Sequence, residues 1–296
     1  MNSTILFTIL SLSSLGVLSG IILFFIAKKF HVEEDPRIDD VEGVLPGANC
    51  GGCGYPGCRK FAEVCVQSKE LEGLFCPVGG NNCMTDVAKI LGIEVIEKAA
   101  MTAVVRCNGS YQNRPRTNVY DGTTWCKIVH NLYSGETGCS YGCMGLGDCV
   151  KSCKFDAIYI SEETGLPVID QDKCVACGAC VKACPRKLIE LRLKGKANRR
   201  IFVACSNPEK GGLARKVCKA ACIGCGKCVK VCPFDAIEMK GPLAYIDFNK
   251  CKLCRKCVLE CPTGAIHEIN FPPKKSKPQP DPSGVAEKIE NKDSSA

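Results

Sequence analysis

The sequence predicts an α+β protein made of small modules behind a single N-terminal transmembrane helix. The first observation is an uncharged apolar stretch within the first 32 residues, which is long enough to cross a bilayer. The second is that most of the 26 cysteines among the 296 residues fall into repeated runs with metal-ligand spacing, separated by short strand-like segments. Because the cysteines form such runs rather than scattered pairs, we expect a reducing compartment and not a disulfide framework.

A membrane anchor is predicted over residues 1–32. The stretch from Thr4 to Ala27 has 24 residues without a charge and is rich in Leu, Ile and Phe. A secretory signal peptide is the alternative, but no basic segment precedes the stretch and no A-x-A-like cleavage site follows it. Lys28 and Lys29 follow the stretch, so the positive-inside rule predicts that the rest of the chain lies on the cytoplasmic side.

A small iron–sulfur domain is predicted over residues 47–98, after an acidic stretch at residues 33–46 that we interpret as a solvated linker. Glycines surround its first cysteines and allow backbone N–H groups to approach cluster sulfurs. A structural zinc ion is the alternative for these cysteines. The expected ligands of one 4Fe-4S cluster are Cys50, Cys53, Cys58 and Cys76.

The remaining segments of this domain are predicted from apolar spacing. Residues 59–73 and 84–98 have helical periodicity, and residues 103–106, at the start of the next module, are strand-like. Cys65 lies within the first of these segments, so we interpret it as a small buried residue and not as a ligand.

A ferredoxin-like module with two clusters is predicted over residues 199–271. It has two copies of the spacing C-x2-C-x2-C-x3-C-P, in which three cysteines bind one cluster and the fourth binds its neighbour. A bare C-x2-C pair would also suit zinc, but two complete motifs, each followed by proline, favour iron–sulfur clusters. The expected ligand sets are Cys222, Cys225, Cys228 and Cys261, and Cys251, Cys254, Cys257 and Cys232.

An equivalent module is predicted over residues 99–198. Its second motif is regular, whereas its first is stretched to C-x3-C-x5-C-x3-C and has Lys154 in place of proline. The chain repeats itself after the fourth cysteines, as in Phe155-Asp-Ala-Ile158 and Phe234-Asp-Ala-Ile237, which indicates four half-modules. The expected ligand sets are Cys139, Cys143, Cys149 and Cys184, and Cys174, Cys177, Cys180 and Cys153.

These five ligand sets use twenty cysteines and leave six others: Cys65, Cys83, Cys107, Cys126, Cys205 and Cys218. Four of the six follow the repeat, because Val104-Val-Arg-Cys107 matches Phe202-Val-Ala-Cys205, and Cys126 and Cys218 each precede the first motif of a module. A sixth cluster shared by these four is one interpretation. We prefer the simpler one, in which they are buried thiols, because free cysteine packs readily in cores.

The combination of these motifs resembles a known family. The anchor, the Gly-Ala-Asn-Cys-Gly-Gly-Cys-Gly-Tyr-Pro-Gly-Cys run that ends at Cys58, and the ferredoxin motifs together resemble the B subunit of the Rnf complex, up to about Ile269. That complex is a membrane-bound, ion-translocating ferredoxin:NAD oxidoreductase. The resemblance implies an electron-transfer subunit in the bacterial inner membrane, with soluble ferredoxin and the other subunits as partners.

Alternatives to this function are a membrane-anchored polyferredoxin that feeds another reductase and a redox regulator. No Gly-rich dinucleotide fingerprint follows a strand, so the sequence supports neither a nicotinamide or flavin site nor a complete active site in this chain. Clusters are therefore expected to carry its chemistry.

Basic residues concentrate between Lys182 and Lys230, where fourteen Lys or Arg residues accompany two acids. Neither a motif nor interleaved aromatic residues support nucleic-acid binding. We instead expect this stretch to attract an acidic ferredoxin, through Lys194, Lys196, Arg199 and Arg200. The tail at residues 272–296 is rich in Pro, Lys and Ser and is predicted to be disordered.

Overall fold

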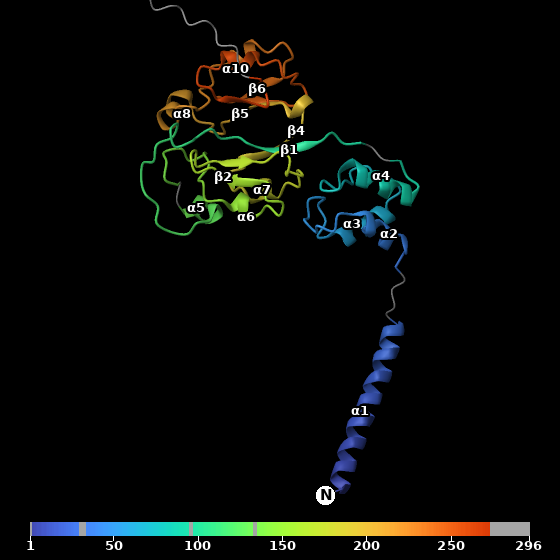
Figure 1. The fold of residues 1–296 in the computed structure, drawn as a ribbon. Coiled ribbons are helices and arrows are strands. Elements are labelled where there is room, and N and C mark those ends of the chain that lie inside the picture. Colours follow the sequence, from blue (N-terminus) through green and yellow to red (C-terminus); the bar gives the residue numbers. More distant parts are fainter. Residues whose placement is uncertain (1, 30–33, 95–96, 133–134, 273–296) are drawn as a thin grey trace, which may run out of the picture. The chain divides into compact units, whose positions relative to one another are not determined.

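The computed structural model describes residues 2–29, 34–94, 97–132 and 135–272. The chain divides after Lys98 into two compact units (Figure 1), which are described separately below. The predicted tail lies outside the described residues from position 273 onward.

The N-terminal helix α1 (Asn2–Lys29) confirms the predicted apolar helix. Within it, Leu6–Lys29 has a mean hydropathy of 2.4 and is long and apolar enough to cross a membrane, by length and composition. Three serine hydroxyls of this helix donate to carbonyls one turn back: those of Ser11, Ser14 and Ser19. These bonds satisfy the three hydroxyls within the helix.

The first unit contains three further helices, α2 (Arg37–Val44), α3 (Cys58–Gln67) and α4 (Gly80–Leu91). The linker prediction is wrong for residues 37–44. Ile38, Val41 and Leu45 lie on one face of α2 and are buried in the core formed with α3 and α4. The acids that suggested a linker lie on the outside, where Arg59 of α3 pairs with Asp39 at 2.9 Å and with Glu42 at 2.8 Å.

The second unit contains two similar halves, each with two antiparallel pairs of strands. In the first half the pairs are β1 (Met101–Val105) with β4 (Ile189–Leu193), and β2 (Ile158–Ile160) with β3 (Pro167–Ile169). In the second half they are β5 (Arg200–Val203) with β8 (Ile266–Ile269), and β6 (Ile237–Lys240) with β7 (Leu243–Ile246). The mixed helix and strand class predicted from the sequence is confirmed.

Short helices connect these strands. They are α5 (Cys126–Leu132), α6 (Asp148–Lys151), α7 (Ala179–Ala183), α8 (Gly211–Val217), α9 (Lys227–Lys230) and α10 (Lys256–Glu260), and a 3-10 turn covers Lys196–Asn198. Figure 1 shows α6 and α7 close to the strands of the first half and α10 close to those of the second.

The two halves meet where their first strands, β1 and β5, end. Val104, Phe202 and Ala204 are buried together there, and the Asn108 N–H donates to the Ala204 carbonyl at 2.9 Å. Arg192 of β4 is 1% exposed and lies against the rings of Phe202, Tyr245 and Phe248 at 5.4–5.8 Å. Aromatic faces, the Glu190 carboxylate at 2.5 Å and the carbonyl of Ile201 therefore surround a guanidinium that joins the two halves.

This packing corrects part of the charge prediction. Arg200 opens β5 and is only 3% exposed, and Lys194 and Arg199 are half-buried. Of the four basic residues expected to attract a partner, only Lys196 is exposed. Counting charges along the chain could not reveal this, because burial depends on how the halves pack.

Candidate metal centres

In the first unit, three of the predicted ligands belong to one core: Cys53, Cys58 and Cys76. Backbone N–H groups face the ligand sulfurs, since Gly52 donates to Cys50 Sγ and Gly79 donates to Cys76 Sγ, both at 3.4 Å. Such bonds favour the thiolate form that ligates iron.

A fifth cysteine tunes this set. Cys83 interacts with Cys76 and lowers the pKa of Cys76, and the Cys83 thiol also donates to the Val44 carbonyl at 3.4 Å. Gly79 lies so close to Cys83 that a Cβ on residue 79 would be 2.4 Å from the Cys83 Cβ. Cys65 is fully buried on α3, and burial raises its pKa to about 12.

In the second unit, three small cavities are each lined by the four cysteines of one predicted set. One is lined by Cys222, Cys225, Cys228 and Cys261, the next by Cys232, Cys251, Cys254 and Cys257, and the third by Cys153, Cys174, Cys177 and Cys180. In each case the fourth cysteine of one motif lies beside the first three of the other.

The same local geometry positions the third cysteine of every motif in the second unit. The residue before the short helix has a left-handed backbone, with φ of 83° at Gly147, 76° at Gly178, 69° at Gly226 and 66° at Arg255. Glycine adopts this conformation without strain. At the exception, Arg255, both oxygens of Glu268 accept hydrogen bonds from the guanidinium at 2.6 Å.

The donor sets fit iron–sulfur clusters. Burial is the main reason that the pKa is raised to about 12 at Cys180, about 11 at Cys228 and about 12 at Cys257, and neighbouring thiols add to each increase. Four thiolates so close together require bound cations to be stable. A zinc ion needs its ligands around one point at about 2.3 Å, and among the described residues no three Cys, His, Asp or Glu side chains converge in that way.

The fourth cavity differs from the predicted set, because it has Cys126 where Cys139 was expected. Its cysteines are Cys126, Cys143, Cys149 and Cys184. Asp148 fixes this arrangement by accepting the N–H groups of Cys126 at 2.8 Å and Lys127 at 3.1 Å, so that α5 begins beside α6. The stretched spacing and the missing proline were the signals that this motif departs from the usual rule.

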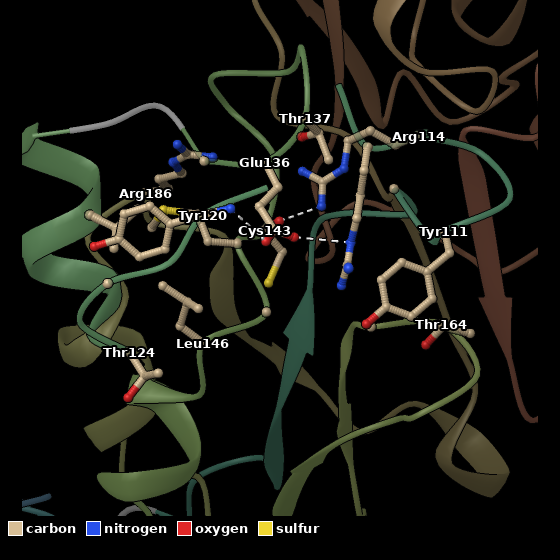
Figure 2. A pocket seen from close by; sticks show the side chains of 18 residues that line it. Tyr111, Arg114, Tyr120, Thr124, Glu136, Thr137, Cys143, Leu146, Thr164 and Arg186 are labelled. Carbon is tan, nitrogen blue, oxygen red and sulfur yellow. Dashed lines mark hydrogen bonds and ion pairs between the residues drawn. The ribbon is translucent and has the colours of Figure 1, made fainter. Parts of the chain in front are cut away.

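Arginines support the loop that carries Cys139 and Cys143. Arg114 donates to the Cys143 carbonyl and Arg186 to the Gly142 carbonyl. Figure 2 shows both along a cavity of about 200 Å³, where Arg116 also pairs with Glu136 at 3.0 Å. Motif spacing predicted no role for these arginines, because they lie outside the cysteine motifs.

Comparisons with known proteins agree with the cluster chemistry. Families described as a 4Fe-4S dicluster domain match residues 138–189 and 221–265, and a 4Fe-4S double cluster binding domain matches residues 173–235. A family described as a putative Fe-S cluster matches residues 45–73.

Three relatives are similar over most of their length. The chain is 42% identical over 254 residues, 86% of this chain and 75% of the relative, to the B subunit of the Na(+)-translocating ferredoxin:NAD(+) oxidoreductase complex of Acetobacterium woodii. It is 39% identical to the B subunit of the ion-translocating oxidoreductase complex of Methanosarcina acetivorans, over 86% of this chain and 94% of the relative. It is also 38% identical to the B subunit of the proton-translocating ferredoxin:NAD(+) oxidoreductase complex of Clostridium ljungdahlii, over 90% of this chain and 93% of the relative.

Proposed function

The chain belongs to the B-subunit family of Rnf-type ion-translocating oxidoreductase complexes, and from this premise we propose that it carries electrons between reduced ferredoxin and NAD within such a complex. The observation that carries this proposal is the series of cysteine-lined cavities in the second unit. When bound, 4Fe-4S clusters supply one-electron transfer. We assign the NAD site to a different protein of the complex, because this sequence has no dinucleotide fingerprint.

We assign a 4Fe-4S cluster to each of the four cavities and to the first unit. The residues of the chain hold these sites in three ways: thiols ligate, backbone N–H groups face the sulfurs, and left-handed turns aim the third cysteine of each motif in the second unit. The first unit would use Cys50, Cys53, Cys58 and Cys76, as the sequence predicted.

The chain associates with a membrane through α1, and we propose that the remainder lies on the cytoplasmic side. Lys28 and Lys29 occupy the last turn of α1. Positive residues at this end favour retention of the flank in the cytoplasm. The acids from Glu34 to Glu42 do not oppose this, because acidic residues contribute little to orientation.

Soluble ferredoxin is the partner that we propose for the second half of the second unit. Cys225 and Cys254 are exposed, unlike the other ligand cysteines, so electrons have a short path to the surface there. Exposed lysines flank them: Lys227 near Cys225, and Lys252 and Lys256 near Cys254. An acidic partner would be steered to these sites.

Stopped-flow reduction of the full chain by reduced ferredoxin tests this assignment. We expect Lys252→Gln combined with Lys256→Gln to slow the second-order rate by about 10-fold at low salt and to flatten its salt dependence. The matched control is Lys127→Gln combined with Lys151→Gln, which removes two exposed charges from the first half of the unit. Equal effects of the control and the double variant would contradict docking at Cys254.

A further inference from the structure

A second group of cysteines lies where the two halves of the second unit meet, and none of the five assigned sites uses it. Cys107 follows β1, Cys205 follows β5, and Cys218 follows α8. Cys139 joins them, because the fourth cavity has Cys126 in its place. We propose a sixth 4Fe-4S cluster at this junction, with four ligands: Cys107, Cys139, Cys205 and Cys218.

Backbone contacts bring three of these residues together: Cys107, Cys205 and Cys218. The segment after Cys107 makes two backbone hydrogen bonds. Its Asn108 N–H donates to the Ala204 carbonyl at 2.9 Å, and its Asn113 carbonyl accepts from the Lys219 N–H at 2.8 Å. Cys205 and Cys218 therefore each adjoin a residue that is bonded to this segment.

Cys139 lies in the same group. The side-chain amide of Asn207, which is 2% exposed, faces Cys139 Sγ at 3.9 Å from two residues beyond Cys205. Burial is the main reason that the pKa of Cys218 is raised, and the neighbouring thiols of Cys107 and Cys139 raise it further. Such mutual repulsion requires these sulfurs to be near one another.

Backbone N–H groups face the sulfurs of this group, as they face those of predicted ligands in the first unit. Gly109 N–H donates to Cys107 Sγ at 3.4 Å, two residues along the chain, as Gly52 does to the predicted ligand Cys50. The N–H groups of Asn207 and Ala220 face Cys205 and Cys218 at the same two-residue separation and lower their pKa against the effect of burial.

Positive charge is also available at the junction. Arg114 is 8% exposed, and its Nε has no hydrogen-bond partner among the described residues. Its guanidinium lowers the pKa of Cys218 and of Cys143. A buried cation beside several thiols offsets part of the negative charge of a thiolate-ligated cluster.

The position of the site indicates its role, which rests on the proposed electron-transfer function. Cys143 N–H donates to Cys107 Sγ at 3.4 Å, and Cys222 N–H faces Cys205. The junction therefore contacts one ligand residue from an assigned site in each half. One electron would leave the reduced cluster of one half, reduce the sixth cluster, and then pass to the cluster of the other half, with no further reactant.

Iron and acid-labile sulfide in the full chain, purified anaerobically in detergent, provide the first test. Six clusters require about 24 of each per chain, whereas five require about 20. A fully loaded chain with about 20 would overturn the proposal without affecting the electron-transfer function. Conversely, a chain with about 24 that took no electrons from reduced ferredoxin would contradict the function and leave the sixth site standing.

Variants test the ligand set. Cys107→Ala combined with Cys218→Ala should remove about four irons, whereas the control Cys65→Ala should remove none. Adding Cys139→Ala to the double variant should cause no further loss, because that cluster is already absent. Adding Cys126→Ala instead should lower the iron content again. The ligand set would be overturned if Cys139→Ala caused the further iron loss and Cys126→Ala did not, or if the double variant kept the wild-type iron content.

Discussion

Asp148 should control the stability of one cluster site without ligating it. It is 8% exposed and accepts two backbone N–H groups, from Cys126 at 2.8 Å and from Lys127 at 3.1 Å. The carboxylate thus satisfies the start of α5 and places Cys126 beside Cys149, which follows Asp148 in α6. In Asp148→Ala the N–H groups of Cys126 and Lys127 both lose their acceptor, and the N–H group of Cys126 is buried.

The structure allows an estimate of the effect. Removing a side chain that caps a helix costs ~1 kcal/mol, and hydrogen bonds to charged acceptors are stronger than neutral ones. We therefore expect Asp148→Ala to lower the free energy of opening at this site by about 2 kcal/mol, which corresponds to about a 30-fold larger open population. Asp148→Asn keeps one acceptor oxygen and should change the population by about 5-fold.

The assay is anaerobic release of iron to a chelator in moderate urea, because cluster loss makes unfolding irreversible and a rate is the appropriate measure. About four irons should leave early in Asp148→Ala, and the rest at the wild-type rate. Asp170→Ala is a matched control, since Asp170 accepts the N–H groups of Asp172 and Lys173 in the loop before Cys174. Uniform acceleration of all the iron in Asp148→Ala would refute a local role for this carboxylate.

Three further predictions concern other parts of the chain. Cys232→Ala should disturb the site of Cys251, Cys254 and Cys257 and spare that of Cys222, Cys225 and Cys228; site-resolved spectroscopy showing the opposite would contradict the exchange of ligands between motifs. Val41→Ala should destabilise the first unit by about 2 kcal/mol, because Val41 is fully buried. Gly43→Ala, at an exposed helical position with open space around it, should stabilise the unit by ~0.5 kcal/mol; equal unfolding midpoints of the two variants would argue against packing of α2. Burial lowers the pKa of His267 below its usual value, so the contribution of His267 to stability is complete above about pH 6.5 and is lost as the pH falls toward its folded pKa. His267→Phe should therefore flatten the pH dependence of the unfolding rate between pH 7 and 5. An unchanged slope would exclude His267 as the source of this dependence.

Local rules account for most of the proposed cluster ligands. In the regular motifs, three cysteines separated by two residues are brought together by the loop itself, so spacing alone defines them. The fourth cysteine of one motif lines the cavity of the other, as the crossover rule predicted. The helices and strands near Cys65 and Cys107 followed equally from apolar periodicity, as α3 and β1 show.

The misassigned features depend on tertiary packing. The apolar face of α2 was overlooked because acids dominate the composition of the segment, although Ile38, Val41 and Leu45 have helical spacing. Arg200 looked like a surface charge because nothing in a charge count shows that all four residues of β5 are buried. Cys126 could not be distinguished from Cys139 by spacing, since Asp148 selects it through contacts with α5.

The internal repeat also explains why the junction site was hard to recognise. The repeat pairs Cys107 with Cys205 and Cys126 with Cys218; a cluster shared by these four was one interpretation, and buried thiols were the preferred one. In the structure Cys126 instead joins the fourth cavity of the first half, whereas Cys218 lies near Cys107 and Cys139. Each half then contributes two ligands to the junction, so neither half contains the site alone. A duplication followed by packing of the two copies would create such a site without any new cysteine motif, which is why motif spacing alone does not reveal it.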